Sequence, residues 1–258
     1  QNGNEQLAEL GFHNGTLRNF FDLYFPYGFM LSVGAMYTRD IYNVVQKNMN
    51  EKAPSGTYNE QPGRVYWTKN NYYDNPKTKT VIQLTNGDEK GYQYSFNAVL
   101  TKKFDFGFTG SFGYTYTMAK DMTANPGSSA ASVWQNNVAV NSLNDPGVSY
   151  SLFSTPHRLI ANASYEVAYA NMKTTVSLFY TGYQQGRFSY TYSNDMNGDG
   201  NYSDLMYVPA SKEEMTFVDI KDKQNNVTYS AVDQQEDFWN YVNNDSYLND
   251  HKGQYEER

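Results

Sequence analysis

The stretch from Phe106 to Thr117 reads FGFTGSFGYTYT, and its strict alternation predicts a long β-strand. Five of its six even-numbered positions are aromatic, and all six odd-numbered positions are Gly, Ser or Thr. Successive side chains of a strand point to opposite sides. We therefore expect a strand with one aromatic face and one small, polar face.

The same period-2 pattern recurs on both sides of this stretch. Tyr92 to Leu100 and Leu159 to Val167 show it clearly, whereas the segment before Phe25 is irregular around Asn19 and Asp22. The sequence thus predicts an all-β fold of about six antiparallel strands. The expected strands span residues 16–25, 28–46, 79–104, 106–121, 152–168 and 171–192.

The connections between these strands alternate in length. Very short turns are expected near 26–28, 105–107 and 168–171, and long loops at 48–78, 122–151 and 193–258. Short turns on one rim and long loops on the other are typical of transmembrane β-barrels of the outer membrane. Long loops without structure are uncommon in compact soluble domains. The alternative is a soluble β-sandwich binding module, in which a second sheet buries the aromatic faces.

Composition narrows the functional class. The chain of 258 residues is only 39% hydrophobic, yet it has 25 Tyr and 15 Phe, and Tyr suits places where one end is apolar and the other wet. Its formal charge of −7 disfavours a nucleic-acid partner. Without cysteine it has neither disulfides nor thiolate metal sites. Residues 193–258 hold 14 acids and 5 bases, which predicts a solvated external loop.

No run of about 18 apolar residues is present, so no transmembrane helix is expected. The chain opens on Gln1-Asn2-Gly3, with neither an initiator Met nor a signal peptide. We expect both ends to be cuts through a longer protein.

Several separated strings resemble the barrel of Bacteroidetes TonB-dependent outer-membrane receptors, with the Oar-like group most similar. The resemblance covers nearly the whole chain and keeps the order of the motifs. The strings are FPYGF at Phe25–Phe29, KGY at Lys90–Tyr92, FSTPHRL at Phe153–Leu159, DMNGDGN at Asp195–Asn201, DLMYVP at Asp204–Pro209, and YL at Tyr247–Leu248 with HKGQYEER at His251–Arg258.

The resemblance implies a 22-stranded barrel around an N-terminal plug. This chain would supply about six strands, while the plug, the remaining strands and the TonB-contacting part are absent. The implied function is TonB-dependent import of an oligosaccharide, a peptide or a chelated metal across the bacterial outer membrane. Implied partners are outer-membrane lipid and lipopolysaccharide, the missing plug and strands, TonB, and a surface lipoprotein. An alternative is an outer-membrane protein for adhesion or secretion.

One loop carries the first half of a calcium-binding pattern. Oxygen ligands at positions 1, 3 and 5, with Gly at 6, resemble an EF-hand loop. Met206 stands at position 12, where such loops carry a bidentate Glu, so a turn without an ion is the alternative. We expect that the protein requires no cofactor, and calcium is the one ion that the loop pattern suggests. Its candidate ligands are Asp195, Asn197, Asp199, Asn201 and Asp204.

Aromatic residues of the expected loops are candidates for contacting a substrate, for example by stacking on a sugar. The alternative is that they form small cores that hold the long loops in place. The candidates are Tyr66, Trp67, Tyr72, Tyr73 and Trp134.

Nothing in the sequence indicates an enzyme. The three histidines, His13, His157 and His251, have no metal-ligand spacing, and no nucleophile motif is present. We therefore predict a non-enzymatic protein. A short helix is expected near residues 233–242.

Overall fold

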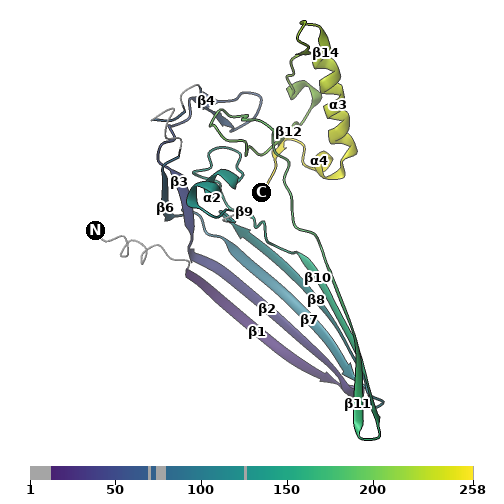
Figure 1. Ribbon diagram of the computed structural model, residues 1–258. Coiled ribbons are helices and arrows are strands. Elements are labelled where there is room, and N and C mark those ends of the chain that lie inside the picture. The colour runs from purple at the N-terminus through teal and green to yellow at the C-terminus, as the bar shows by residue number, and fades with distance from the viewer. Residues whose placement is uncertain (1–12, 69–70, 74–79, 125–126, 258) are drawn as a thin grey trace, which may run out of the picture. The chain divides into compact units, whose positions relative to one another are not determined.

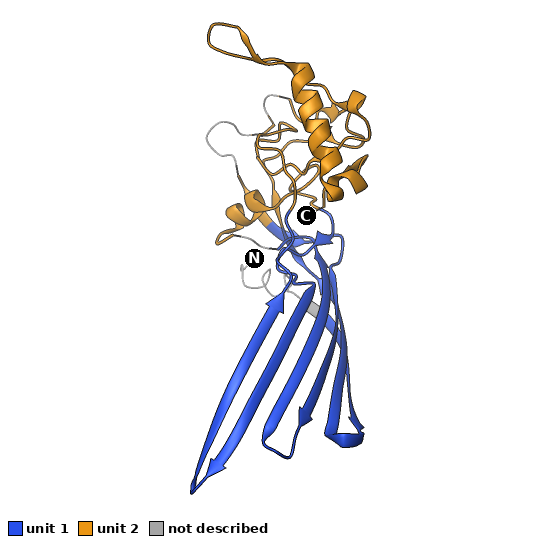
Figure 2. Cartoon of the chain, turned by 90° about the vertical axis from the view of Figure 1, so that its right-hand side faces the viewer, with its two compact units in different colours: residues 1–45, 84–124, 147–188 blue, residues 46–83, 125–146, 189–258 orange. Residues whose placement is uncertain are grey.

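The computed structural model describes residues 13–68, 71–73, 80–124 and 127–257, and most of its regular structure is antiparallel β-sheet (Figure 1). Within these ranges no helix is long and apolar enough to cross a membrane. The chain divides into two compact units (Figure 2). Unit 1 comprises residues 1–45, 84–124 and 147–188, and unit 2 comprises residues 46–83, 125–146 and 189–258.

Unit 1 is built on one sheet of long strands. Neighbouring strands are antiparallel, and within the described residues the sheet is open, with β1 and β11 at its edges. A two-residue strand, β9 (Ser149–Tyr150), pairs with β8. In spatial order the long strands are β1 (His13–Phe25), β2 (Phe29–Tyr42), β7 (Tyr92–Lys103), β8 (Phe108–Asp121), β10 (His157–Tyr169) and β11 (Met172–Tyr183).

The register places the alternating residues of all six strands on common faces. Tyr114 of β8, for example, pairs with Ala98 of β7 and Leu159 of β10. The face that carries these residues is apolar from β1 to β11, and we call it the apolar face. One cross-strand row on it runs Leu23, Leu31, Leu100, Phe112, Ala161 and Tyr180.

The opposite face is the more polar of the two, as the sequence pattern predicts, although apolar residues such as Phe20 and Phe179 also lie on it. The hydroxyls of Thr16 and Thr38 form a hydrogen bond of 3.2 Å between β1 and β2. The hydroxyl of Ser32 donates to the carboxylate of Asp22 at 2.5 Å. We call this the polar face. Its row beside Leu23 runs Asp22, Ser32, Val99, Gly113 and Ile160.

Three tight turns close one end of the sheet. The first is a 3-10 turn, η1 (Pro26–Gly28), in which Tyr27 and Gly28 have φ of 66° and 76°. The second contains Gly107, with φ of 92°, where a side chain would overlap the backbone oxygen of Glu166. Ala170, with φ of 51°, turns β10 into β11. The long connections all leave from the other end, as expected.

Unit 2 collects the long connections, which fold into short elements around two small cores. One core is Met206, Val208, Val242 and Leu248, and the other is Trp134, Ala139 and Leu143. The elements are β4 (Gly56–Thr57), β5 (Val65–Tyr66), α2 (Ala130–Asn136), β12 (Tyr207–Val208), η2 (Lys212–Glu214), β13 (Ile220–Lys221), β14 (Val227–Tyr229), α3 (Ala231–Asn244), α4 (Ser246–Asp250) and β15 (Gln254–Tyr255).

Several strand boundaries differ from the sequence prediction. The strand expected over 79–104 is two strands, β6 (Ile82–Asn86) and β7, and β3 (Val44–Asn48) follows β2 and pairs with β6. β11 ends at Tyr183 rather than continuing to residue 192. The helix expected at 233–242 is α3, which Ser230 caps by accepting the backbone N–H of Asp233.

Candidate functional site

The calcium-like loop of unit 2 is folded around the carboxylate of Asp195. This side chain accepts the backbone N–H of Gly198 at 2.7 Å and that of Gly200 at 2.9 Å. Both glycines have positive φ, 79° and 92°, which other residues adopt at a cost. A side chain at Gly198 would also overlap the backbone oxygen of Trp67. The tight turn therefore requires glycine here.

The remaining candidate ligands order the rest of the same loop. The Asn197 side-chain oxygen accepts the backbone N–H of Asp199 at 2.9 Å, and Asp199 accepts that of Asn201 at 2.7 Å. Asp204 folds back and accepts the N–H of Met196 at 2.9 Å. All five predicted ligands thus belong to one compact loop, in which five carboxylate and amide oxygens of four of these residues accept backbone N–H groups.

These bonds bear directly on metal binding. Over the described parts of the chain, no three Asp, Glu or His side chains come together as a metal-binding group. The loop has oxygen donors of the kind that calcium prefers, but they would have to turn from backbone N–H groups toward an ion. Calcium binding by Asp195, Asn197, Asp199, Asn201 and Asp204 stays a prediction.

A second set of predicted residues holds this loop from outside. The backbone N–H of Trp67 donates to the oxygen of Asn197 at 2.7 Å. The Tyr72 hydroxyl donates to the oxygen of Asp199 at 3.0 Å. Burial, with Asp199 nearby, raises the pKa of Tyr72 to about 12, so its hydroxyl remains a donor at neutral pH. Two of the five aromatic candidates, Trp67 and Tyr72, thus contact the calcium-like loop from more than 120 residues away in sequence.

The loop aromatics divide by exposure. Trp67, Tyr72 and Trp134 are buried, and only 1% of Trp134 is exposed. The indole N–H of Trp134 donates to the side-chain oxygen of Asn144 at 3.0 Å. Their burial favours the alternative that they hold the loops in place. Tyr73 is 71% exposed, and Tyr66 is partly exposed. These two remain candidates for contacting a substrate.

Arg64 is a fully buried cation that sequence reasoning missed. Its guanidinium approaches Asp204 at 3.4 Å and donates to the backbone oxygen of Leu205. The rings of Tyr192 and Tyr255 lie 5.5 and 5.1 Å from it. A lone Arg after a Pro-Gly pair carries no sequence signal for burial. In the fold, it joins the calcium-like loop to the β12–β15 region.

Three carboxyls of this site are protonated more readily than free ones. Burial raises the pKa of Asp199 and that of Asp204 to about 6 each. Burial also raises the pKa of Glu51 to about 7, helped by the charge of Asp199 and opposed by a hydrogen bond from Ser142 at 2.8 Å. One Glu51 carboxyl oxygen is buried without a hydrogen-bond partner. Buried like charges of this kind destabilise the loop when they ionise.

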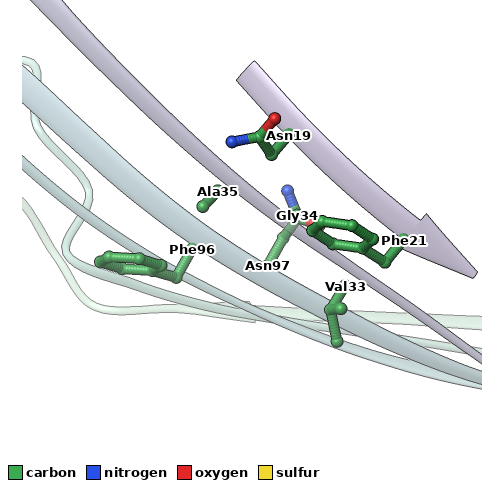
Figure 3. A pocket seen from close by; sticks show the side chains of 7 residues that line it. All are labelled: Asn19, Phe21, Val33, Gly34, Ala35, Phe96 and Asn97. Atoms are coloured by element: carbon green, nitrogen blue, oxygen red, sulfur yellow. The ribbon is translucent and has the colours of Figure 1, made fainter. Parts of the chain in front are cut away.

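The apolar face of unit 1 is the second candidate functional surface. Its large side chains stay in the open, with Leu178 at 71% and Phe112 at 53% exposure. A hollow of about 310 Å³ lies on this face. Figure 3 shows the side chains that line it, with the short side chain of Ala35 between Phe21 and Phe96. Two of the lining residues, Asn19 and Asn97, are polar. Exposed apolar surface on this scale marks a contact with lipid or protein.

Comparisons with known proteins found no matching family model, no matching curated protein and no matching solved structure. The resemblance to TonB-dependent receptors therefore rests on the quoted strings alone. What that resemblance implies for function is a proposal.

Proposed function

We propose that unit 1 forms part of the wall of an outer-membrane β-barrel, in a transporter of the TonB-dependent kind. The observation that carries this proposal is the apolar face, which is continuous across six strands and exposed. A water-soluble sheet with such a face would be an aggregation hazard. In a bilayer, hydrocarbon chains cover the same face and make its exposure favourable.

Strand length supports the same proposal. The six strands have 12 to 14 residues each. A membrane-crossing strand needs about 9–11 residues at a tilt of about 45°, whereas strands of soluble proteins most often have about 5–6. Each of these strands is long enough to cross the hydrocarbon core and reach both interfaces.

The two faces fit the two environments of a plugged barrel. The polar face is rich in Thr and Ser and carries charges of both signs, such as the pair of Lys173 and Glu166 at 2.9 Å. That composition suits a wet interior that faces a plug. The hollow beside Ala35 suits a lipid acyl chain, because apolar groups line it almost completely. A soluble β-sandwich would instead require a second sheet to cover Phe112 and Leu178.

Unit 2 would then serve as the external, substrate-facing part. It is formed by the connections that leave the end of the sheet opposite the tight turns. The two candidates that are not buried, Tyr66 and Tyr73, would contact an oligosaccharide, a peptide or a chelated metal. The buried loop at Asp195–Asp204 would keep these segments in shape, with or without calcium. Energy would come from TonB acting on the plug, so no catalytic residue is needed here.

The proposal is tested in cells. The protein should be recovered in the outer-membrane fraction, and its deletion should abolish uptake of at least one nutrient under starvation. A variant milder than deletion of the whole protein lacks only residues 212–229, the η2 and β13–β14 segment, which lies outside both small cores. Loss of surface attachment with unimpaired uptake of every nutrient tested would contradict transport and favour the adhesion alternative. Recovery in a soluble fraction would contradict the membrane location itself.

A further inference from the structure

One polar side chain interrupts the apolar face at mid-strand. Asn19 lies six residues from each end of β1, and its Cα partner across the sheet is Ala35 of β2. Elsewhere on this face of the six long strands, the described side chains that are charged or carry an amide, imidazole or aliphatic hydroxyl group lie within three residues of a strand end. They are Arg39, Lys102, Lys120, His157 and Thr174. In a bilayer, strand ends lie near the interfaces, whereas Asn19 would lie at mid-depth.

The amide of Asn19 is not satisfied within the sheet. Among the described residues its side chain makes no hydrogen bond, although an amide offers an acceptor oxygen and two donor hydrogens. Hydrocarbon cannot supply these bonds, and an unpaired polar group in a bilayer costs free energy. Acyl chains can therefore cover the apolar side chains around Asn19 but cannot satisfy its amide. The position calls for a partner that brings a polar group to mid-depth.

The surface around Asn19 has hollows and projections side by side. Two hollows, of about 310 and 430 Å³, share Asn19, Ala35 and Phe96 in their linings. The first is the hollow of Figure 3, in which the short side chain of Ala35 leaves room beside Asn19. Along β1, Leu17 and Phe21 stand on either side of Asn19 and are 66% and 62% exposed. A second surface of the same shape can insert its projecting side chains into these hollows.

We propose that Asn19 and the two hollows beside it form the contact between two copies of the protein in the membrane. This inference rests on the proposed membrane location and goes beyond it by naming a second copy as the partner of one part of the apolar face. Two copies inserted in the same direction are related by a two-fold axis along the membrane normal, so a residue near the axis meets its own counterpart at the same depth.

An amide suits such a symmetric contact. Two Asn19 side chains that meet at the axis are self-complementary, because each donates an N–H to the carbonyl oxygen of the other. In lipid, the burial of apolar surface gives little driving force for association. Hydrogen bonds between polar side chains and close packing at small residues, such as Ala35, hold partners together instead.

Cysteine cross-linking of the complete protein in vesicles tests the contact. Under mild oxidation with copper–phenanthroline, Asn19→Cys should yield a disulfide-linked dimer, because a disulfide requires Cα atoms within about 7 Å of each other. The matched control is Leu178→Cys, which also lies at mid-strand on the apolar face and is 71% exposed. It lies five strand spacings away, about 24 Å along the sheet, and should stay monomeric. Equal cross-linking at the two positions would indicate random collision and overturn the proposal.

Two substitutions test the hydrogen bond and the hollows separately. Asn19→Leu removes the amide, and Ala35→Leu fills the hollows. Ala163→Leu, at mid-strand of β10 on the same face, is the control for an enlarged side chain. Dimerisation is measured in vesicles by energy transfer between donor-labelled and acceptor-labelled copies at increasing lipid dilution. We expect Asn19→Leu and Ala35→Leu each to weaken the dimer about tenfold, and Ala163→Leu to leave it unchanged.

The stability of the monomer separates a second copy from other partners of Asn19. At high lipid dilution, where the protein is monomeric, Asn19→Leu should unfold no more easily than the wild type. A less stable monomer would show that a neighbouring strand of the same barrel bonds Asn19, and would overturn the proposal. So would a wild-type protein that stays monomeric in vesicles at every dilution. A protein that melts cooperatively as a monomer in plain buffer would instead reject the membrane location, and the proposal with it.

Discussion

Introducing a charge in the middle of β10 should have opposite consequences on its two faces. Ala163 lies six residues from each end of this strand, on the apolar face, between Gly110 and Leu178. The next residue, Ser164, lies on the polar face between Thr109 and Ser177. Ala163→Arg would therefore place a cation at mid-depth in lipid, and Ser164→Arg would place it in the wet interior.

The expected losses of stability differ by about 1–4 kcal/mol. An Arg on the lipid face at the bilayer midplane costs about 2–4 kcal/mol, and this cost falls toward about 0–1 kcal/mol near the interfaces. For Ser164→Arg we expect a change within about 1 kcal/mol, because water and polar neighbours remain available. At room temperature this difference corresponds to a factor of roughly 5 to several hundred in the folding equilibrium.

The assay is urea unfolding of the protein in phospholipid vesicles, followed by far-ultraviolet circular dichroism. This signal reports on the strands, whereas the fluorescence of the three Trp would report on unit 2, which contains all of them. A larger loss of stability for Ser164→Arg than for Ala163→Arg would refute the assignment of the faces. Equal, small losses would show that neither face contacts lipid.

Three further predictions concern unit 2. The pKa of Glu51 in the folded state, about 7, lies above its ordinary value of 4.5. Between these two pH values the folded state keeps a proton that the unfolded state loses, so the free energy of unfolding should fall as pH rises from about 4.5 to 7. Glu51→Gln should remove about 2 kcal/mol of that decline between pH 5 and 7, measured by denaturant unfolding, and an unchanged pH profile would contradict its cause. Gly198→Ala should lower the free energy of unfolding by at least about 2 kcal/mol more than Gly63→Ala does. Both positions have positive φ, but only a side chain at Gly198 would overlap the backbone oxygen of Trp67, so equal falls in melting temperature for the two variants would exclude this overlap. If the loop binds calcium, the ion at ten times its Kd should stabilise unit 2 by about 1.4 kcal/mol, and Asp195→Asn should reduce this gain. An unchanged free energy of unfolding at millimolar calcium would exclude calcium binding by the loop.

The strands of unit 1 were predictable because their signal is local. Alternation along Phe108–Thr117 defines both faces without reference to any other strand. The turn at Gly28 and the helix capped at Ser230 likewise follow from a few neighbouring residues. The strand boundaries differ from the prediction, and the segment expected to be one strand over 79–104 is interrupted at Gly87–Gly91, so that it forms two strands, β6 and β7.

The arrangement of unit 2 was not predictable in the same way. Trp67 meets Asn197, and Arg64 meets Asp204, across more than 120 residues of sequence. Such contacts depend on how several irregular segments pack, and no periodic pattern encodes them. The candidate ligands are close together in the sequence and lie in one loop of the structure, whereas the sequence gave no sign that Tyr72 would hold this loop from outside.

The most direct test of the membrane assignment is a spin-label scan along β8. The chain has no cysteine, so single cysteines introduced at residues 109–117 can each be labelled uniquely. In vesicles, labels at even-numbered positions should be accessible to oxygen dissolved in the bilayer, and those at odd-numbered positions to a water-soluble nickel chelate. This period-2 alternation is the predicted result. Equal access to the nickel chelate at every position, in a protein that melts cooperatively as a monomer in plain buffer, would contradict the barrel wall.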